Sequence, residues 1–244
     1  MTSRRRADRL LVERGLFRTR AQAQAAIAAG KVTADGAPVR KASDAIAAEA
    51  VLDAAPAHPW VSRGGVKLAA ALDAFAIDPA GQACLDVGAS TGGFAEVLLA
   101  RGARRVYAVD VGRDQLHPRL RADPRVVSLE ETDIRALDPA RLEAPPTLIA
   151  VDVSFVSLKL VLPAAFALAG RPARLVALVK PQFEAGRRRL KKGIVRDPEV
   201  HRQVCDEMIE WVASRGWIVS GLVPAPIAGG DGNREFLLAA ESSD

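Results

Sequence analysis

The chain has 244 residues, of which 49% are hydrophobic and 5% aromatic, so it can bury a sizeable core built mainly from aliphatic side chains. Two cysteines are too few for a disulfide framework, and the longest apolar stretch, 160–169, is far shorter than the ~20 residues of a membrane-spanning helix. No apolar run follows the basic start, so we expect no signal peptide and a cytoplasmic protein. The net charge of +5 is concentrated at one end: residues 1–41 hold ten Lys or Arg and three Asp or Glu, against 24 and 26 in the remainder.

The first 60 residues predict a small α+β domain. Two short amphipathic segments end at Gly15 and Gly30, which favours two helices, and Thr19 can cap the second one. Residues 31–33 and 38–39 flank the sequence Ala-Asp-Gly-Ala, which predicts a β-hairpin. One last strand and a linker are expected in the segment that follows, up to residue 60.

This basic region is similar to a known RNA-binding module. The stretches Arg-Leu-Leu-Val-Glu-Arg-Gly-Leu-Phe-Arg-Thr-Arg (9–20) and Ala-Ile-Ala-Ala-Gly-Lys-Val (26–32) resemble the S4 domain. The resemblance implies contacts with RNA phosphates, whose affinity falls as salt rises. The candidate side chains here are Arg4, Arg5, Arg6, Arg9, Arg14, Arg18, Arg20 and Lys31. The alternative is a charged face that only keeps the protein in solution.

From residue 61 onward, short apolar segments alternate with helical patterns. We expect strands at 83–87, 105–110, 125–128, 147–153, 174–180, 217–223 and 235–240, and helices near 66–76, 93–101, 113–121, 156–169 and 198–214. The strands are apolar throughout, as in sheets that are covered on both faces. This pattern predicts an α/β fold with a doubly wound, Rossmann-like parallel sheet, and it divides the chain into domains 1–60 and 61–244.

A glycine-rich loop follows the first strand of the second domain. The sequence Asp-Val-Gly-Ala-Ser-Thr-Gly-Gly-Phe (86–94) fits neither a P-loop nor the dinucleotide pattern Gly-x-Gly-x-x-Gly. Its terminal acid would repel a pyrophosphate but suits a cation. The arrangement resembles the loop with which class I methyltransferases hold S-adenosylmethionine (SAM), whose sulfonium is positive. The candidate cofactor residues of the loop are Asp86, Gly88, Ser90, Thr91, Gly92, Gly93 and Phe94.

Acidic residues also follow the next two strands. Asp110 can accept two hydrogen bonds from a ribose diol, with helix capping as the alternative. Val111 is a further candidate cofactor contact. Asp133 could meet the adenine amino group, and a solvated side chain before Ile134 is the alternative.

Four other charged residues lie where the predicted strands or helices place them beside this loop: Lys67, Asp152, Lys180 and Glu235. A lysine that ends an apolar strand is unusual, because lysine is seldom buried without a partner. Ligands of such sheets lie beyond the carboxyl ends of the strands, where Asp152 and Lys180 fall. A purely structural network of buried ion pairs is the alternative reading of the same residues.

The motifs occur in an order that resembles the TlyA, or haemolysin A, family, whose members are similar to FtsJ-type RNA ribose 2′-O-methyltransferases. They are Ser-Arg-Gly-Gly-x-Lys-Leu (62–68), the glycine loop, Tyr-Ala-Val-Asp-Val-Gly (107–112), Asp-Val-Ser-Phe (152–155), Leu-Val-Lys-Pro-Gln-Phe-Glu-Ala-Gly (178–186) and Gly-Asn-x-Glu-Phe-Leu (232–237). The chain departs from the family at Ala95, Glu96 and Asp133, where the motifs usually have Thr, Asp and Asn.

This resemblance implies SAM as methyl donor and a cytidine 2′-hydroxyl of ribosomal RNA, free or in ribosomal subunits, as acceptor. It also implies that Lys67, Asp152, Lys180 and Glu235 form a catalytic tetrad, in which Lys180 is the base or the hydroxyl-orienting group. No metal ion is expected.

Further RNA contacts are expected near this site. Arg63 and the basic run at 187–192, with Arg187 and Arg188, can bind phosphates, and Phe155 or Phe183 can stack on a flipped base. A solvated loop and ordinary packing are the respective alternatives. Two other functions compete with the enzyme: a membrane-active haemolysin, for which no suitable amphipathic segment is evident, and an RNA-binding assembly factor without catalysis.

Overall fold

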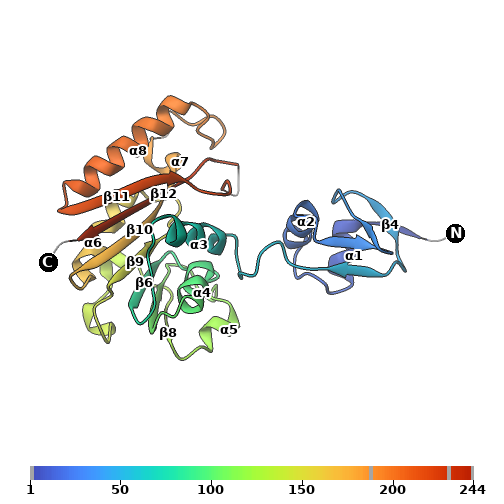
Figure 1. Cartoon of the computed structure of the whole chain (residues 1–244), viewed down its shortest axis with the longest axis horizontal. Helices are drawn as coiled ribbons and strands as arrows, with labels where there is room; N and C mark the ends of the chain where they lie inside the picture. The colour runs from blue at the N-terminus through green and yellow to red at the C-terminus, as the bar shows by residue number, and fades with distance from the viewer. Residues whose placement is uncertain (1–2, 187–188, 230–231, 243–244) are drawn as a thin grey trace. The chain divides into compact units, whose positions relative to one another are not determined.

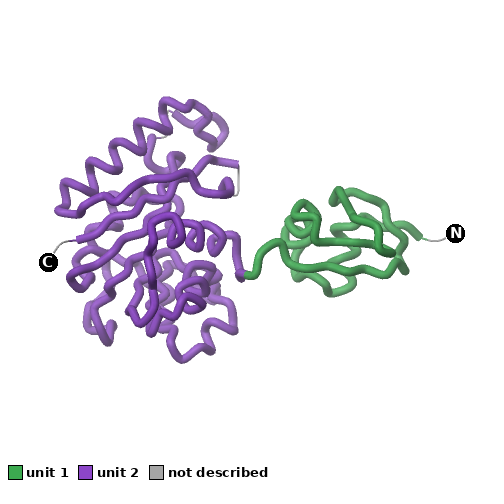
Figure 2. Tube along the Cα trace, viewed as in Figure 1, with its two compact units in different colours: residues 1–59 green, residues 60–244 purple. Residues whose placement is uncertain are grey.

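The computed structural model describes residues 3–186, 189–229 and 232–242. The chain divides into two compact units, residues 1–59 and residues 60–244, which Figure 2 shows in different colours. Each unit buries its own cluster of apolar side chains, so each has a separate hydrophobic core.

The first unit combines two short helices with small antiparallel sheets (Figure 1). Its elements are β1 (Arg4–Arg6), α1 (Ala7–Glu13), α2 (Arg20–Ala28), β2 (Val32–Ala34), β3 (Ala37–Pro38), β4 (Ala45–Ala47) and β5 (Leu52–Ala54). Thr19 caps α2 by accepting a hydrogen bond from the N–H of Gln22 at 3.3 Å. Asp35 and Gly36 have φ values of 49° and 77° in the turn between β2 and β3. The predicted helix cap and hairpin are therefore confirmed.

Two features of this unit differ from the prediction. Residues Arg4–Arg6 form a strand that pairs with β4, although all three are exposed and nothing in their pattern indicates a strand. The segment after the hairpin contributes two strands, β4 and β5, where one was expected. Pairing with a distant segment decides these short strands, because intrinsic strand preference depends strongly on context.

In the second unit, the described residues form a seven-stranded sheet in the order β11-β12-β10-β9-β6-β7-β8. The strands are β6 (Ala83–Val87), β7 (Arg105–Val109), β8 (Val126–Leu129), β9 (Leu148–Val151), β10 (Ala173–Val179), β11 (Trp217–Pro224) and β12 (Phe236–Ser242). The chain runs from β6 outward to β8 and then returns to β9 on the other side of β6. The order of strands therefore reverses between β6 and β9, which is where sheets of this type bind ligands.

Helices cover both faces of the sheet (Figure 1). They are α3 (Gly64–Ala74), α4 (Gly93–Ala100), α5 (Pro118–Arg121), η1 (Ile134–Ala136), η2 (Pro139–Arg141), α6 (Leu158–Leu168), α7 (Pro181–Glu184) and α8 (Pro198–Ala213). On β6, Cys84 joins the core cluster under α3 and α4, and Leu85 joins the cluster under α6 and α8. Both faces of the strand need apolar residues for this reason. No helix in the described parts of the chain has the length and apolar character needed to cross a membrane.

The predicted α/β fold is confirmed, but the expectation of a wholly parallel sheet is wrong. Strand β12 runs antiparallel to both of its neighbours, β10 and β11. A parallel connection needs a crossover of roughly a dozen residues or more, usually a helix, and no helix is described between β11 and β12. The helix expected at 113–121 is also shorter, because α5 begins only at Pro118.

Candidate active site

The loop between β6 and α4 is pressed against two neighbouring segments. Gly88 has a φ of 84°, and a Cβ there would lie 2.4 Å from the carbonyl oxygen of Asp152. Gly92 has a φ of 93°, and a Cβ on Gly93 would lie 2.1 Å from Oγ of Ser62. Only glycine permits these conformations and approaches. The motif glycines therefore hold the loop against the end of β9 and the segment that leads into α3.

Other members of the loop differ in exposure. Ser90 and Thr91 are exposed, and the carbonyl of Thr91 accepts a hydrogen bond from the N–H of His117 at 3.2 Å. Phe94 is only 3% exposed and packs in the core cluster under α3 and α4. Its side chain therefore has almost no surface for a ligand, whereas a cofactor contact by Ser90 and Thr91 stays a prediction.

Asp86 lies beneath the loop and is fully buried. Neither of its carboxyl oxygens has a hydrogen-bond partner among the described residues, although the N–H of Ala95 lies close enough to favour the charged form slightly. Burial, and to a smaller extent the carboxylate of Asp152, raises the pKa of Asp86 to about 8. A buried acid without a partner is costly to the fold, and such groups concentrate at functional sites.

The next strand end carries Asp110. Its Oδ2 accepts the N–H of Ser90 at 2.8 Å and its Oδ1 accepts the N–H of Gly112 at 2.7 Å, so this carboxylate joins the glycine loop to the loop after β7. Val111, beside it, is 73% exposed. A carboxylate with free lone pairs next to an exposed apolar side chain can hold a ribose and the base attached to it.

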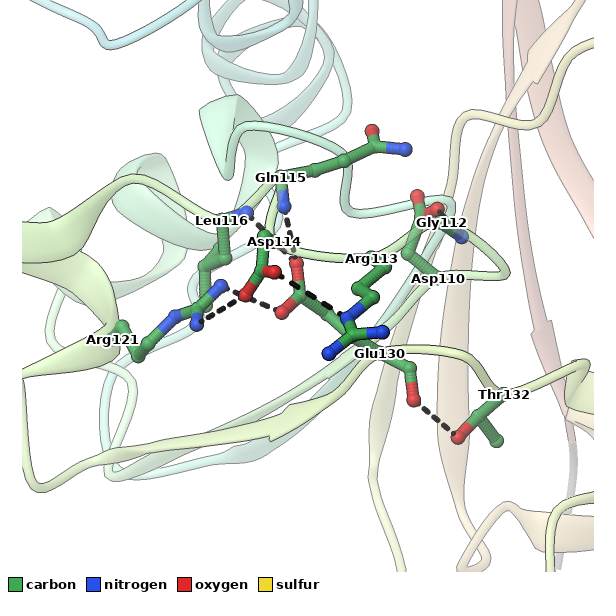
Figure 3. Close-up of polar contacts among 9 residues, drawn as sticks. All are labelled: Asp110, Gly112, Arg113, Asp114, Gln115, Leu116, Arg121, Glu130 and Thr132. Atoms are coloured by element: carbon green, nitrogen blue, oxygen red, sulfur yellow. Dashed lines mark hydrogen bonds and ion pairs between the residues drawn. The ribbon is translucent and has the colours of Figure 1, made fainter.

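A second carboxylate organises the same loop, as Figure 3 shows. Oε1 of Glu130 accepts the N–H groups of Gln115 and Leu116 at 2.7 Å and 2.9 Å, and Oε2 binds Arg121 at 2.6 Å. Arg121 in turn binds Asp114 at 3.2 Å. Glu130 was not predicted from the sequence, where the only available signal was its position one residue beyond a strand end.

Asp133 makes mainly local contacts. Its Oδ1 caps η1 by accepting the N–H of Arg135 at 2.9 Å, and its Oδ2 binds the guanidinium of the same residue at 2.5 Å. These bonds hold the pKa of Asp133 below its ordinary value. The structure thus gives this side chain a capping role, and its adenine contact stays a prediction.

The four residues of the expected tetrad form two ion pairs. Nζ of Lys67 lies 2.5 Å from Oε2 of Glu235, and Nζ of Lys180 lies 2.5 Å from Oδ1 of Asp152. Lys67, Lys180 and Glu235 are buried, with at most 7% of their surface exposed. Charged groups this deep are retained only when they are paired.

The backbone brings the two pairs to one edge of the sheet. Val179 of β10 pairs with Phe236 of β12, so the adjoining Lys180 and Glu235 leave two neighbouring strands at the same end. A Cβ on Gly64, in the first turn of the helix that carries Lys67, would lie 3.6 Å from Oδ2 of Asp152. The tetrad therefore converges beside the glycine loop.

Two further side chains border Lys180, namely Ser154 and Phe183, whose ring centroid lies 5.9 Å from the lysine Nζ. Its Nζ donates a hydrogen bond to Oγ of Ser154 at 2.9 Å. Phe155 is 92% exposed at a φ of 66°, and its ring centroid lies 5.2 Å from that of Phe183. A positive φ is uncommon for a residue with a bulky side chain. Ser154 was missed in the sequence analysis, although its place in Asp-Val-Ser-Phe, directly after a strand end, could have indicated it.

In the first unit, part of the basic character is used internally. Asp8 is fully buried and accepts hydrogen bonds from Arg6 at 3.1 Å, from Arg20 at 2.7 Å and from the amide of Gln24 at 2.8 Å. Hydrogen bonding to Arg6, followed by Arg20 and Gln24, holds the pKa of Asp8 well below its ordinary value against the effect of burial. Arg6 and Arg20 therefore hold the unit together, whatever else they contact.

The other predicted RNA contacts divide by their partners. Arg4 and Arg14 donate to backbone carbonyls at 3.1 Å and 2.5 Å, and Arg63 in the second unit donates to the carbonyl of Ala228 at 2.6 Å. Four candidates have side chains without a hydrogen bond or ion pair to any described residue: Arg5, Arg9, Arg18 and Lys31. Arg187 and Arg188 lie outside the described residues.

Together, the reversal of strand order beside a glycine loop and the charged residues at the strand ends define an α/β methyltransferase domain joined to a small basic unit. Comparison with known families agrees: residues 60–242 match the FtsJ-like methyltransferase family, and residues 5–52 match the S4 domain. The chain therefore belongs to the FtsJ-like methyltransferase family and carries an S4 domain.

Individual relatives extend this assignment over nearly the whole chain. The chain is 47% identical over 243 residues to the 16S/23S rRNA (cytidine-2'-O)-methyltransferase TlyA of Mycobacterium tuberculosis, covering 98% of this chain and 90% of that protein. Hemolysin A of Brachyspira hyodysenteriae is 36% identical over 95% of this chain and 98% of its own. A solved structure from Streptococcus thermophilus, named provisionally as a hemolysin, has a TM-score of 0.78 at 41% identity and covers 100% of this chain and 90% of its own. The resemblance inferred from the motifs is confirmed.

Proposed function

We propose that the protein transfers a methyl group from SAM to the 2′-hydroxyl of a cytidine in ribosomal RNA, in the cytoplasm. The observation that carries this proposal is the convergence of two lysine–carboxylate pairs beside the glycine loop. The name of the 47% identical relative supports ribosomal RNA and the cytidine 2′-oxygen as the acceptor.

The charges at the strand ends fit SAM. Asp86, Asp110 and Asp152 are close enough for the latter two carboxylates to raise the pKa of Asp86, and a sulfonium bound beside them would favour the ionised form of Asp86. Asp110 can accept the ribose hydroxyls, and the exposed side chain of Val111 can lie against the adenine ring. When bound, SAM supplies an electrophilic methyl group on positively charged sulfur.

The tetrad would activate the acceptor. A 2′-hydroxyl must lose its proton as its oxygen forms the new bond to carbon. Nζ of Lys180 takes this proton when it stands as the neutral amine, or orients the hydroxyl when it stands as the ammonium of its ion pair with Asp152. Asp152 and Ser154 hold that nitrogen in place at 2.5 Å and 2.9 Å. The ammonium group of Lys67, held by Glu235, stabilises the negative charge that develops on the oxygen. Correct alignment of the reacting atoms can supply roughly 7–11 kcal/mol of the barrier reduction.

RNA contacts would come from both units. The unpaired Arg5, Arg9, Arg18 and Lys31 of the S4 domain can bind phosphates. The exposed ring of Phe155 lies next to Phe183, whose ring centroid is 5.9 Å from Nζ of Lys180, and it can stack on the base of a nucleotide rotated toward the tetrad.

A transfer assay tests the proposal directly. Purified protein is incubated with SAM carrying a labelled methyl group and with ribosomal subunits from cells that lack the gene. The label is expected at a cytidine whose 3′ phosphodiester resists alkaline hydrolysis, because its 2′-oxygen carries the methyl group. Label on a base, on protein, or on no RNA at all would contradict the proposed function.

A further inference from the structure

The end of the basic run forms a defined turn. Lys191 and Ile194 exchange two backbone hydrogen bonds, of 3.0 Å and 3.1 Å, around Lys192 and Gly193. The two central residues have φ values of 54° and 79°, the combination found in the type I′ turns of tight β-hairpins. A positive φ is strained for lysine, and such strain persists only where the surroundings enforce it.

Asn233 enforces the conformation of this turn. Its side chain is 2% exposed, its Nδ2 donates to the carbonyl of Gly193 at 3.1 Å, and its Oδ1 accepts the N–H of Val195 at 3.1 Å. The carbonyl of Val195 also accepts a hydrogen bond from Nε2 of His201, at 3.0 Å. The C-terminal side of the turn is therefore tied to the interior of the second unit.

This attachment links the turn to the tetrad. Asn233 lies two residues before Glu235 on the segment that leads into β12, so the turn is held close to the strand end that carries a tetrad residue. Lys191 and Lys192 are exposed, and neither makes an ion pair or a side-chain hydrogen bond with any described residue. Two unpaired ammonium groups on a rigid turn beside a site for RNA are suited to a phosphodiester backbone.

We infer that residues 191–194, which we call the lysine turn, bind the phosphate backbone of the RNA substrate, and that Asn233 is a positioning residue that holds the lysine turn beside the tetrad. This inference rests on the proposed function. A solvated loop would behave differently in one measurable respect, because lysines that bind phosphates release counterions condensed on the RNA, whereas lysines without a phosphate contact do not.

The first test removes the two charges. The double variant Lys191→Ala/Lys192→Ala and the wild type are titrated with a ribosomal RNA fragment at several salt concentrations. The plot of log affinity against log salt has a negative slope, and its magnitude should decrease by roughly 1.4 to 1.8, because each neutralised phosphate contributes about 0.7 to 0.9. An unchanged slope would overturn the inference.

A matched control removes the same number of positive charges from another part of the surface. Arg104 and Arg174 are exposed, have unpaired side chains within the described structure, and lie at the opposite, amino-terminal edge of the sheet. The variant Arg104→Ala/Arg174→Ala should retain the wild-type slope. An equal decrease in this control would show a general effect of net charge and would also overturn the inference.

The second test removes the positioning residue without removing charge. Asn233→Ala should lower the salt slope toward that of the double lysine variant, and it should add no further decrease when combined with that variant. Affinity for SAM should stay within about twofold of wild type. A purely structural role would lower the melting temperature and leave the slope unchanged, which would refute the positioning role.

A further variant keeps the test decisive if Asn233→Ala does not fold. A Cβ at Gly193 would meet nothing within 4 Å, but its φ of 79° disfavours alanine, so Gly193→Ala should loosen the lysine turn without disturbing Asn233. The same decrease in slope is expected, and no decrease would refute the inference. Wild-type protein that binds RNA but transfers no methyl group would refute the proposed function alone, because the slope is a binding measurement.

Discussion

Asp8 in the first unit and Asp86 in the second are both completely buried, and the two have opposite surroundings. Asp8 of the S4 domain accepts hydrogen bonds from two arginines and a glutamine, which hold its pKa below the ordinary value. Asp86 of the methyltransferase domain has no hydrogen-bond partner among the described residues, and burial raises its pKa to about 8. The first carboxylate stabilises its fold, whereas the second is retained at a cost beside the glycine loop.

The difference separates a buried carboxylate that holds a fold together from a buried carboxyl group that is left without a partner beside a candidate ligand site. It also gives the two units opposite responses to pH. The stabilisation by Asp8 is present above about pH 4, the ordinary pKa of an aspartate, and is lost as the pH falls. Protonated Asp86 favours the folded state, so its contribution is greatest below about pH 4 and is lost as the pH rises toward 8.

The largest expected effect concerns the charges of the methyltransferase domain. Lys180→Ala should lower the rate of methyl transfer by about 100- to 10,000-fold, the usual contribution of a proton-transferring group, and leave SAM affinity near wild type. Single-turnover transfer and calorimetric SAM binding measure the two quantities. Lys159→Ala is the control, because this lysine is partly exposed and its ion pair with Glu207 lies on the surface. Full activity of the Lys180 variant would contradict the catalytic role proposed for the buried lysine of the methyltransferase domain.

The next effect concerns the S4 domain. Asp8→Ala removes the shared acceptor of Arg6, Arg20 and Gln24 and should destabilise residues 4–54 by about 1.5–3 kcal/mol, the range for hydrogen bonds to a charged group. Hydrogen exchange of backbone amides in that segment reports the change. The control Asp73→Ala removes an exposed pair with Arg101 and should cost less than about 1 kcal/mol. Equal protection in both variants would contradict the structural role of Asp8.

A smaller effect tests the sign of the pH response. Asp86→Asn cannot ionise, so between pH 5 and pH 8 its stability should improve relative to wild type by about 1–2 kcal/mol in total. This is within the limit of about 4 kcal/mol that one proton sets over about three pH units, at about 1.4 kcal/mol per unit. Denaturant unfolding of cofactor-free protein across this pH range gives the difference. A difference that does not change with pH would show that Asp86 is already ionised at pH 5.

The smallest effect distinguishes the two kinds of arginine within the S4 domain. Arg9→Ala removes an unpaired side chain and should reduce the salt slope of RNA binding by less than about 1, with unchanged stability. Arg6→Ala should lower the stability of the unit, since it removes a partner of Asp8. Titration with RNA and thermal melting separate the two outcomes. Identical behaviour of the variants would mean that pairing with Asp8 does not set Arg6 apart.

Local signals in the sequence were sufficient for much of the fold and the site. Thr19 could be assigned as a helix cap because capping needs only a side-chain oxygen at the right spacing. Asp152 and Lys180 could be placed together without coordinates because strand ends of an α/β sheet meet at one edge, whereas the family resemblance implied the complete tetrad.

Other features depend on which distant segments meet. The ion pair between Lys67 and Glu235 joins residues 168 positions apart, and the antiparallel direction of β12 follows from its placement between β10 and β11. Nothing in the sequence distinguished one basic residue of the first unit from another. In the structure, Arg6 and Arg20 differ from the others because they pair with the buried Asp8. The sequence by itself determined the fold class and pointed to the charged residues near the strand ends, because these follow from residue type, spacing and motif order. Only the tertiary structure decided which charges are paired, because burial and pairing depend on contacts that no local pattern encodes.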